Sequence, residues 1–299
     1  MIERLCIIGV GLIGGSLARD LRAQKLCGEV VGASRRAENL ERAKALGVID
    51  RFDTDITAAV RGADMVVVAA PLGATEQIFA AMRGGLSDGV VVTDVGSAKC
   101  SVLRAAESAF GEVPDFLVPG HPIAGTEHSG VEASFEGLFR DRQVILTPVE
   151  GTRAEATARV TDMWQATGAR VVEMDAAHHD EVLAATSHLP HMLAYTLVDV
   201  LGRMEERVEI FRYAAGGFRD FTRIASSDPQ MWHDICIANG EALAHALEHF
   251  SADLNQAIEA IRRGDGEAIK SLFVRAKALR DRYAQNDAGP SSARPASTE

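Results

Sequence analysis

The sequence has few cysteines, no long apolar run and no excess of basic residues, and each absence excludes a class of protein. Its four cysteines are scattered without metal-ligand spacing, which predicts reduced thiols and a cytoplasmic location rather than a disulfide framework. No apolar run approaches the roughly 18 residues that a membrane span needs, and the N-terminus does not resemble a signal peptide. A net charge of -11 disfavours nucleic acid and anionic membranes as partners.

The chain of 299 residues is long enough for two domains. Over 1–174, continuous apolar runs alternate with helical segments, which predicts a doubly wound parallel sheet, an α/β domain of the Rossmann type. These runs are 65–70, 90–94, 116–119, 143–147 and 170–174. From 175 to 285 apolar residues recur at helical spacing, which predicts an all-α domain, and 286–299 have the composition of a disordered tail. The helices are too few and too apolar for a thick core of their own, so we expect a homodimer through this half.

A glycine-rich turn follows the apolar strand at 5–8 and precedes an amphipathic helix. In a dinucleotide fingerprint Gly9 would allow the tight turn, Gly11 would let the backbone approach a pyrophosphate, and Gly14 would let helix and strand pack closely. The phosphates would lie at a helix N-terminus, where free N–H groups favour an anion. The predicted cofactor-binding residues are Gly9, Gly11, Leu12, Ile13, Gly14, Ser34, Arg35, Arg36, Ala70, Pro71, Asp94 and Ser97.

The end of the second predicted strand, 29–33, bears on which dinucleotide binds. An NAD enzyme usually has Asp or Glu here to accept hydrogen bonds from the ribose 2′-hydroxyl, but this chain has Ser34, Arg35 and Arg36. Guanidinium groups suit a 2′-phosphate by charge and geometry, so the sequence favours NADP, with NAD as the alternative. A solvated start to the next helix would also explain the two arginines.

Two segments follow strand ends where ligands of open α/β sheets bind, 94–99 and 120–127. His121 is the candidate general base, because histidine titrates near neutral pH; a loop histidine that only satisfies the backbone is the alternative. Ser97 could hydrogen-bond that imidazole or a bound alcohol, or simply cap a helix. Lys99 could be a solvated charge.

The helical half contains a dense group of histidines. Ser187, His188 and His191 fall within one sector of a helix that Pro190 should kink, and His179 precedes them. A histidine-lined face is costly unless it lines a cavity. We predict no metal site, because the His-Glu-x-x-His pattern is missing.

A non-periodic segment at 215–232 interrupts the helical pattern. Within it, Arg223 is suited to clamp a substrate carboxylate through two parallel hydrogen bonds. Alternatively, Arg219 and Arg223 pair with Asp220 or Glu209 on the surface.

Together these motifs closely resemble the prephenate/arogenate dehydrogenase family of tyrosine biosynthesis, from residue 1 to about 283. The resemblance rests on the glycine turn at 9–15, Asp94-x-x-Ser97-x-Lys99, 120–127, 188–191 and 217–225. It implies that His121 accepts the proton of the substrate's ring hydroxyl while hydride passes from the same carbon to the nicotinamide, and that loss of the ring carboxylate as CO₂ completes an aromatic ring.

The resemblance also implies the roles of the other residues. Ser97 would orient His121 and the substrate hydroxyl, and the helical half would form the dimer. The implied substrate-binding or site-lining residues are His191, Arg223, Thr126, Glu127, His179, Ser187, His188, Gly216, Asp220 and Trp232, some of them from the partner subunit. With no chorismate mutase segment and no ACT domain, the chain is expected to be monofunctional. Glu127 could pair with the ammonium of arogenate, but the choice between prephenate and arogenate stays open.

Two other functions would fit parts of the pattern. Another Rossmann-plus-helical hydroxyacid dehydrogenase would need a catalytic lysine motif in its helical half, where only Lys270 and Lys277 occur. A non-catalytic NADP sensor or scaffold would have no reason to bring His121, Ser97, His191 and Arg223 together.

Overall fold

The computed structural model describes residues 1–204 and 215–287. The chain forms two compact units, residues 1–243 and 244–299, and each is described by itself. Glu209 and most of the predicted tail lie outside the described residues, although Asn286 and Asp287 belong to the last helix.

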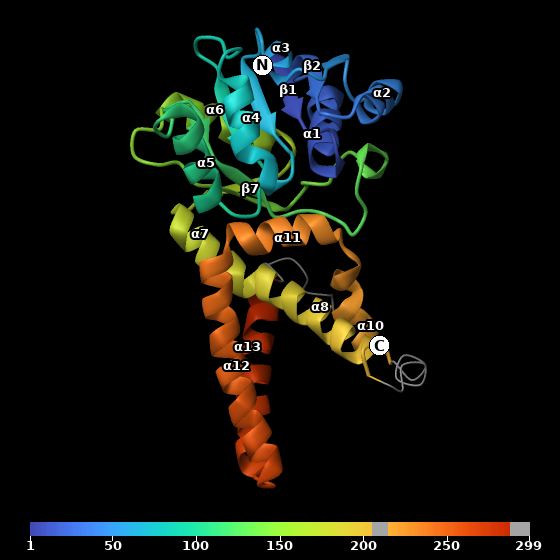
Figure 1. The fold of residues 1–299 in the computed structure, drawn as a ribbon, viewed down its shortest axis with the longest axis vertical. Coiled ribbons are helices and arrows are strands. Elements are labelled where there is room, and N and C mark those ends of the chain that lie inside the picture. Colours follow the sequence, from blue (N-terminus) through green and yellow to red (C-terminus); the bar gives the residue numbers. More distant parts are fainter. Residues whose placement is uncertain (205–214, 288–299) are drawn as a thin grey trace, which may run out of the picture. The chain divides into compact units, whose positions relative to one another are not determined.

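Six parallel strands form the main sheet, in the order β3-β2-β1-β4-β5-β6 (Figure 1). They are β1 (Ile2–Ile8), β2 (Cys27–Ala33), β3 (Arg51–Asp53), β4 (Met65–Val68), β5 (Val91–Asp94) and β6 (Leu117–Val118). This is the doubly wound Rossmann order, and the chain reverses direction across the sheet between β1 and β4. The predicted fold class of this half is therefore confirmed.

Both faces of the sheet are covered, which explains why its strands are apolar at successive positions. Leu5 and Ile7 pack into one buried cluster, whereas Cys6 and Ile8 pack into the other. The helices along this part of the chain are α1 (Leu12–Ala23), α2 (Ala37–Ala45), α3 (Ile56–Ala59), α4 (Thr75–Met82), α5 (Cys100–Phe110) and α6 (Ala154–Ala166).

The prediction of a single parallel sheet over 1–174 is wrong in one respect. Strands β8 (Gln143–Leu146) and β9 (Arg170–Glu173) form a second sheet with β7 (Gly120–Pro122), which runs antiparallel to β8. Apolar runs predict buried strands but not which sheet they join, because that depends on long-range pairing. The segment at 120–122, which we expected to follow the end of a strand, is thus a short strand itself.

Helices make up the rest of the first unit. Helix α7 (Ala176–Leu183) continues through a π-helical turn at Ala184–His188 into α8 (Leu189–Gly202), which has Pro190 in its first turn. The π turn lies where proline removes a backbone donor, in line with the predicted kink. The segment predicted to be non-periodic is instead mostly helical, with α10 (Gly216–Thr222), a 3₁₀ turn at Arg223–Ser226 and α11 (Pro229–Ala238).

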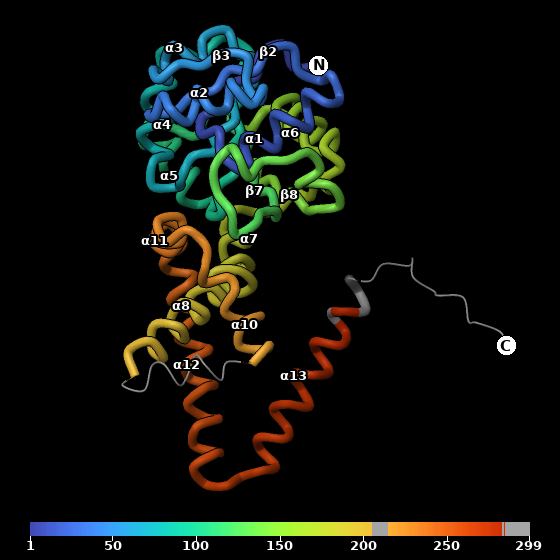
Figure 2. Tube along the Cα trace, turned by 90° about the vertical axis from the view of Figure 1, so that its right-hand side faces the viewer, coloured from blue at the N-terminus to red at the C-terminus, as the bar shows by residue number. Residues whose placement is uncertain are grey.

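Helix α12 (Gly240–Arg262) begins at the end of the first unit, and its part from residue 244 on forms the second unit together with α13 (Gly266–Asp287). The two helices diverge from the turn that joins them (Figure 2). An all-α C-terminal part is thus confirmed. Within the described ranges, no helix is both long and apolar enough to cross a membrane.

Candidate active site

The glycine turn between β1 and α1 has the steric features of a dinucleotide cradle. Gly9 has a φ of +95°, and a Cβ there would lie 2.4 Å from the carbonyl oxygen of Ala69, just beyond β4. A Cβ on Gly14 would lie 2.6 Å from the Gly9 carbonyl oxygen, so helix and strand pack as closely as predicted. A Cβ on Gly11 would meet no atom within 4 Å, which leaves open space beside the first turn of α1. These residues fit a bound pyrophosphate.

The end of β2 lies directly beside this turn, because the Gly9 N–H donates to the Ala33 carbonyl at 2.8 Å. Ser34 is half-buried, and Arg35 and Arg36 are exposed at the start of α2. Ala70 and Pro71 follow β4 at the neighbouring strand end. The residues predicted to contact the cofactor on these strands thus share one edge of the sheet.

His121 is buried on β7, opposite Ile145 of β8, with 9% of its surface exposed. Its Nδ1 is 2.9 Å from Nε2 of His179, and the two rings are steeply inclined. Burial lowers the pKa of His121 well below its ordinary value, and the charges of Lys99 and neighbouring histidines lower it further. His121 is therefore neutral at pH 7 and able to accept a proton.

Lys99 is fully buried, so the alternative of a solvated charge is wrong. Its ammonium donates at 2.6 Å to Asp94 Oδ2 and at 2.6 Å to the Gly120 carbonyl. Asp94 also accepts from the backbone N–H groups of Gly96 and Gly120. This ion pair fastens the end of β5 to β7, the strand that bears His121.

His179 and Asp180 come from α7, more than 50 residues after His121. The His179 Nδ1 is 2.8 Å from Asp180 Oδ1, and the same carboxylate accepts from the N–H groups of Lys99 and Cys100 at the start of α5. These hydrogen bonds lower the pKa of Asp180, against the effect of its burial, which raises it. Asp180 is thus a buried carboxylate that joins α7 to α5.

His188 is connected to Asp180 through Asn239. Asn239 donates at 2.8 Å to the Asp180 carbonyl and lies 3.1 Å from Nδ1 of His188. Burial lowers the pKa of His188 to about 4, although the charge of Asp180 opposes this. We call the connected residues His121, His179, Asp180, His188 and Asn239 the histidine network.

His191 occupies a different environment, half-buried and stacked on Trp232 with ring centroids 3.7 Å apart. Its Nδ1 lies 2.8 Å from the Ser187 carbonyl. Burial lowers its pKa, and the charge of Arg223 lowers it further, while the hydrogen bond to Ser187 opposes both. Arg223 and His191, two candidate residues for binding a substrate carboxylate, therefore lie near each other.

Arg223 pairs with Glu127, with 3.5 Å between Nη1 and Oε2. The alternative partners that we offered for Arg223 were Asp220 and Glu209. Among the described residues, the partner found is Glu127 instead. Thr126, beside Glu127, is exposed, and so are Gly216 and Asp220 on α10.

Our sequence reasoning did not select Asp180, Asn239 or Lys99 for the site. The adjacency of His179 and Asp180 was visible, but nothing in their spacing predicted that one carboxylate would reach both an imidazole and the start of α5. The hydrogen bond found at the His121 ring goes to His179, whereas Ser97 lies half-buried on the neighbouring segment. Among the described residues no cluster of three or more His, Cys, Asp or Glu side chains could hold a metal.

A Rossmann glycine turn and a buried, neutral histidine on the strand held to the end of β5 define the class of a dinucleotide-dependent oxidoreductase. Comparison with known proteins agrees: residues 17–173 match "Prephenate dehydrogenase, nucleotide-binding domain" and 175–275 match "Prephenate dehydrogenase, dimerization domain". The chain belongs to the prephenate dehydrogenase family.

Individual relatives cover nearly the whole chain. It is 42% identical to the cyclohexadienyl dehydrogenase of Zymomonas mobilis, over 94% of this chain and 96% of that one. It is 34% identical to the prephenate dehydrogenase of Bacillus subtilis, over 94% and 76%. The crystal structure of Aquifex aeolicus prephenate dehydrogenase with hydroxyphenyl propionate and NAD⁺ superposes with a TM-score of 0.88 at 36% identity, over 95% and 99%.

These similarities confirm the predicted family and an oxidoreductase of tyrosine biosynthesis that catalyses an oxidative decarboxylation. They set aside the alternatives of a different hydroxyacid dehydrogenase and of a non-catalytic sensor.

Proposed function

We propose that the chain converts prephenate, arogenate or both into 4-hydroxyphenylpyruvate or tyrosine, with release of CO₂. The observation that carries the proposal is the buried His121, neutral at pH 7 because its pKa is lowered, on β7 beside the end of β5 in the sheet that bears the glycine turn. His121 takes the proton of the ring hydroxyl as that carbon becomes a carbonyl carbon. A nicotinamide bound at the glycine turn would supply the acceptor for the hydride that leaves the same carbon. The ring carboxylate leaves as CO₂, its bonding electrons complete the aromatic ring, and the carbonyl oxygen becomes the phenol by taking back the proton held by His121.

Arg223 and His191 are proposed to bind the substrate's carboxylates. Arg223 is paired with Glu127, so a substrate carboxylate competes with Glu127 for the guanidinium. Once displaced, Glu127 is an exposed carboxylate that could accept the ammonium of arogenate. Ser97 is proposed to bind the ring hydroxyl, and Ser187, His188, His179, Thr126, Gly216, Asp220 and Trp232 are proposed to line or close the site.

NADP is the proposed cofactor, and NAD the alternative. The support is the absence of a carboxylate at 34–36 and the exposure of Arg35 and Arg36 beside the glycine turn. Both side chains are free to meet a 2′-phosphate, which a guanidinium binds through paired hydrogen bonds.

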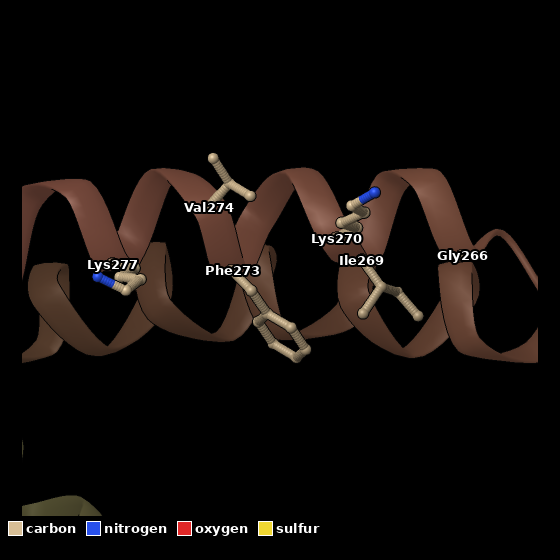
Figure 3. A pocket seen from close by; sticks show the side chains of 6 residues that line it. All are labelled: Gly266, Ile269, Lys270, Phe273, Val274 and Lys277. Carbon is tan, nitrogen blue, oxygen red and sulfur yellow. The ribbon is translucent and has the colours of Figure 1, made fainter.

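The helical half is proposed to form a homodimer, and a domain boundary is proposed near residue 174. Exposed apolar side chains on α12 and α13 support the dimer, among them Leu254, Ile261, Phe273 and Leu279. Ile269 and Phe273 point to the same side of α13, along an open hollow of about 390 Å³ (Figure 3). A second copy would cover these side chains. A cytoplasmic location is also proposed, since all four cysteines are free thiols.

The test is the initial rate of the purified protein with prephenate or arogenate and NAD or NADP, in all four combinations. Turnover by the wild-type protein that is lost in His121→Asn would support the proposal. The wild-type rates in the four combinations would rank the substrates and the cofactors. No turnover in any combination, with the dinucleotide bound, would refute it.

A further inference from the structure

The ring of His121 has two nitrogens, and only one of them can serve a substrate. Its Nδ1 is engaged with Nε2 of His179 at 2.9 Å, which leaves Nε2 as the nitrogen available to take a proton. A neutral imidazole has one N–H group and one nitrogen with a lone pair. The direction of the His121–His179 hydrogen bond therefore decides whether His121 Nε2 has the lone pair or the hydrogen.

Asp180 determines that direction. Its lowered pKa makes it a carboxylate at neutral pH, and a carboxylate only accepts hydrogen bonds. His179 Nδ1, 2.8 Å from Asp180 Oδ1, must therefore carry the hydrogen. In neutral His179 the other nitrogen, Nε2, then has the lone pair and accepts from His121 Nδ1–H. This leaves a lone pair on His121 Nε2.

The carboxylate cannot easily rotate away from this arrangement. Its two oxygens accept from the backbone N–H groups of Lys99 and Cys100 at 2.7 and 2.9 Å, and Asn239 donates to its backbone carbonyl. The groups whose charges act on His121 are Lys99, His179 and His188. The charge of Lys99 opposes protonation of His121. The Asp180 carboxylate lies on the far side of His179, the residue to which protonated His121 would donate through Nδ1.

We propose that Asp180 and His179 are positioning residues that hold His121 in its Nδ1–H form, so that Nε2 is the base, and that they orient the imidazolium once it forms. This inference rests on the proposed function. It extends the role given to His179 from lining the site to selecting the protonation form of the base.

Three variants in the full-length protein distinguish this role from simple packing. In Asp180→Asn, the amide can donate to His179 and reverse both hydrogen bonds, and we expect kcat to fall at least 100-fold; the equivalent change in a Ser-His-Asp triad costs about 10⁴-fold. His179→Leu, which removes the acceptor, should lose about as much. His179→Gln keeps an acceptor for His121, so its kcat should stay within about 10-fold of wild type.

The expected pattern is a loss in kcat with KM and dinucleotide affinity nearly unchanged. Exposed residues serve as matched controls: His178→Gln beside His179, and Asp199→Asn on α8, whose carboxylate pairs with Arg203. Both controls should match wild type. If Leu and Gln at position 179 have equal kcat, or if Asp180→Asn retains full kcat while His121→Asn is inactive, the proposal is wrong. Lack of any wild-type turnover would instead refute the proposed function.

A second readout does not depend on activity or on the folding of any Asp180 variant. Long-range ¹H–¹⁵N spectra of the ¹⁵N-histidine-labelled wild-type protein at pH 7 report which nitrogen of each ring is protonated. His121 is assigned from the signals lost in His121→Asn. We expect protonated Nδ1 and unprotonated Nε2. The opposite form would overturn the proposal.

Discussion

The glycine turn at 9–15 follows β1 in the main sheet, whereas the histidine network starts from β7 of the second sheet, which is held to the end of β5, and the two are assembled differently. The turn consists of neighbours in sequence, and close approaches of Gly9 to Ala69 and of Gly15 to Ser134 complete it. The network joins residues from β7, α7, the π turn and Asn239, which are separated by up to 118 positions between His121 and Asn239. The difference teaches that a dinucleotide-binding turn can be formed by residues adjacent in sequence. The pKa and hydrogen bonds of a buried histidine such as His121, in contrast, depend on residues far away in the chain.

The largest expected effect comes from removing His121, the proposed base. In His121→Asn we expect kcat to fall about 10²- to 10⁴-fold, because a positioned proton acceptor contributes that much. Initial rates at saturating substrate measure it. His128→Asn, an exposed histidine seven positions further on, is the control and should match wild type. Similar losses in both variants would contradict the role of His121.

The next effect tests the ion pair that fastens β5 to β7. Lys99→Met leaves Asp94 buried without its cation, and we expect the free energy of unfolding to fall by about 3–5 kcal/mol. Urea denaturation measures it. The double variant Asp94→Asn with Lys99→Met should recover part of the loss, since no charge is left unpaired. A single variant as stable as wild type would show that the pair does not hold the strands.

The network should also make stability depend on pH, which the glycine turn should not. Because the pKa values of His121 and His188 are lowered in the folded state, the unfolded chain binds more protons below the ordinary value of about 6.5. Stability is therefore present above that pH and is lost as the pH falls. His188, with a pKa of about 4, contributes a loss of about 3 kcal/mol between pH 7 and 4. Urea titrations at several pH values measure this, and His188→Gln should flatten the dependence.

Within the turn, two glycines should respond differently. Gly9→Ala should cost about 1–3 kcal/mol of stability, because its φ of +95° and the approach to Ala69 leave no room for a Cβ. Gly11→Ala should keep the melting temperature, since its Cβ meets no protein atom, but should weaken dinucleotide binding. Thermal unfolding and titration calorimetry separate the two. Unchanged affinity in Gly11→Ala would exclude a close approach of the cofactor there.

The smallest effect concerns cofactor choice. Replacing Arg35 and Arg36 together by serine should weaken NADP binding about 10- to 100-fold, because a hydrogen bond to a charged group contributes about 1.5–3 kcal/mol. NAD affinity should not fall. Titration with both dinucleotides tests this, and an equal loss for both would favour the solvated-helix interpretation of these arginines.

Elements whose sequence pattern is local could be predicted, and elements that depend on distant partners could not. The strand-turn-helix at 5–23 was predictable because its residues are neighbours with a fixed periodicity. Strand β7 was not, since three residues carry no periodic signal and its pairing partner β8 lies more than 20 residues away. The histidine motifs predicted a candidate site. The burial of Lys99 and the hydrogen bonds of Asp180 to α5 could not be predicted, because both depend on how β5, α5 and α7 pack together.

By itself the sequence determined the Rossmann half, the helical half and the family, and it selected His121 as the candidate base. These depend on the periodicity of burial, on glycine sterics and on residue types in short motifs, all of which are local. Only the tertiary structure decided that β7 to β9 form a separate sheet and that Asp180 lies behind His179 and His121. It also decided that Glu127 holds Arg223. The reason is physical: a hydrogen bond or a pKa shift depends on the distance and burial of groups that the chain brings together only when it folds.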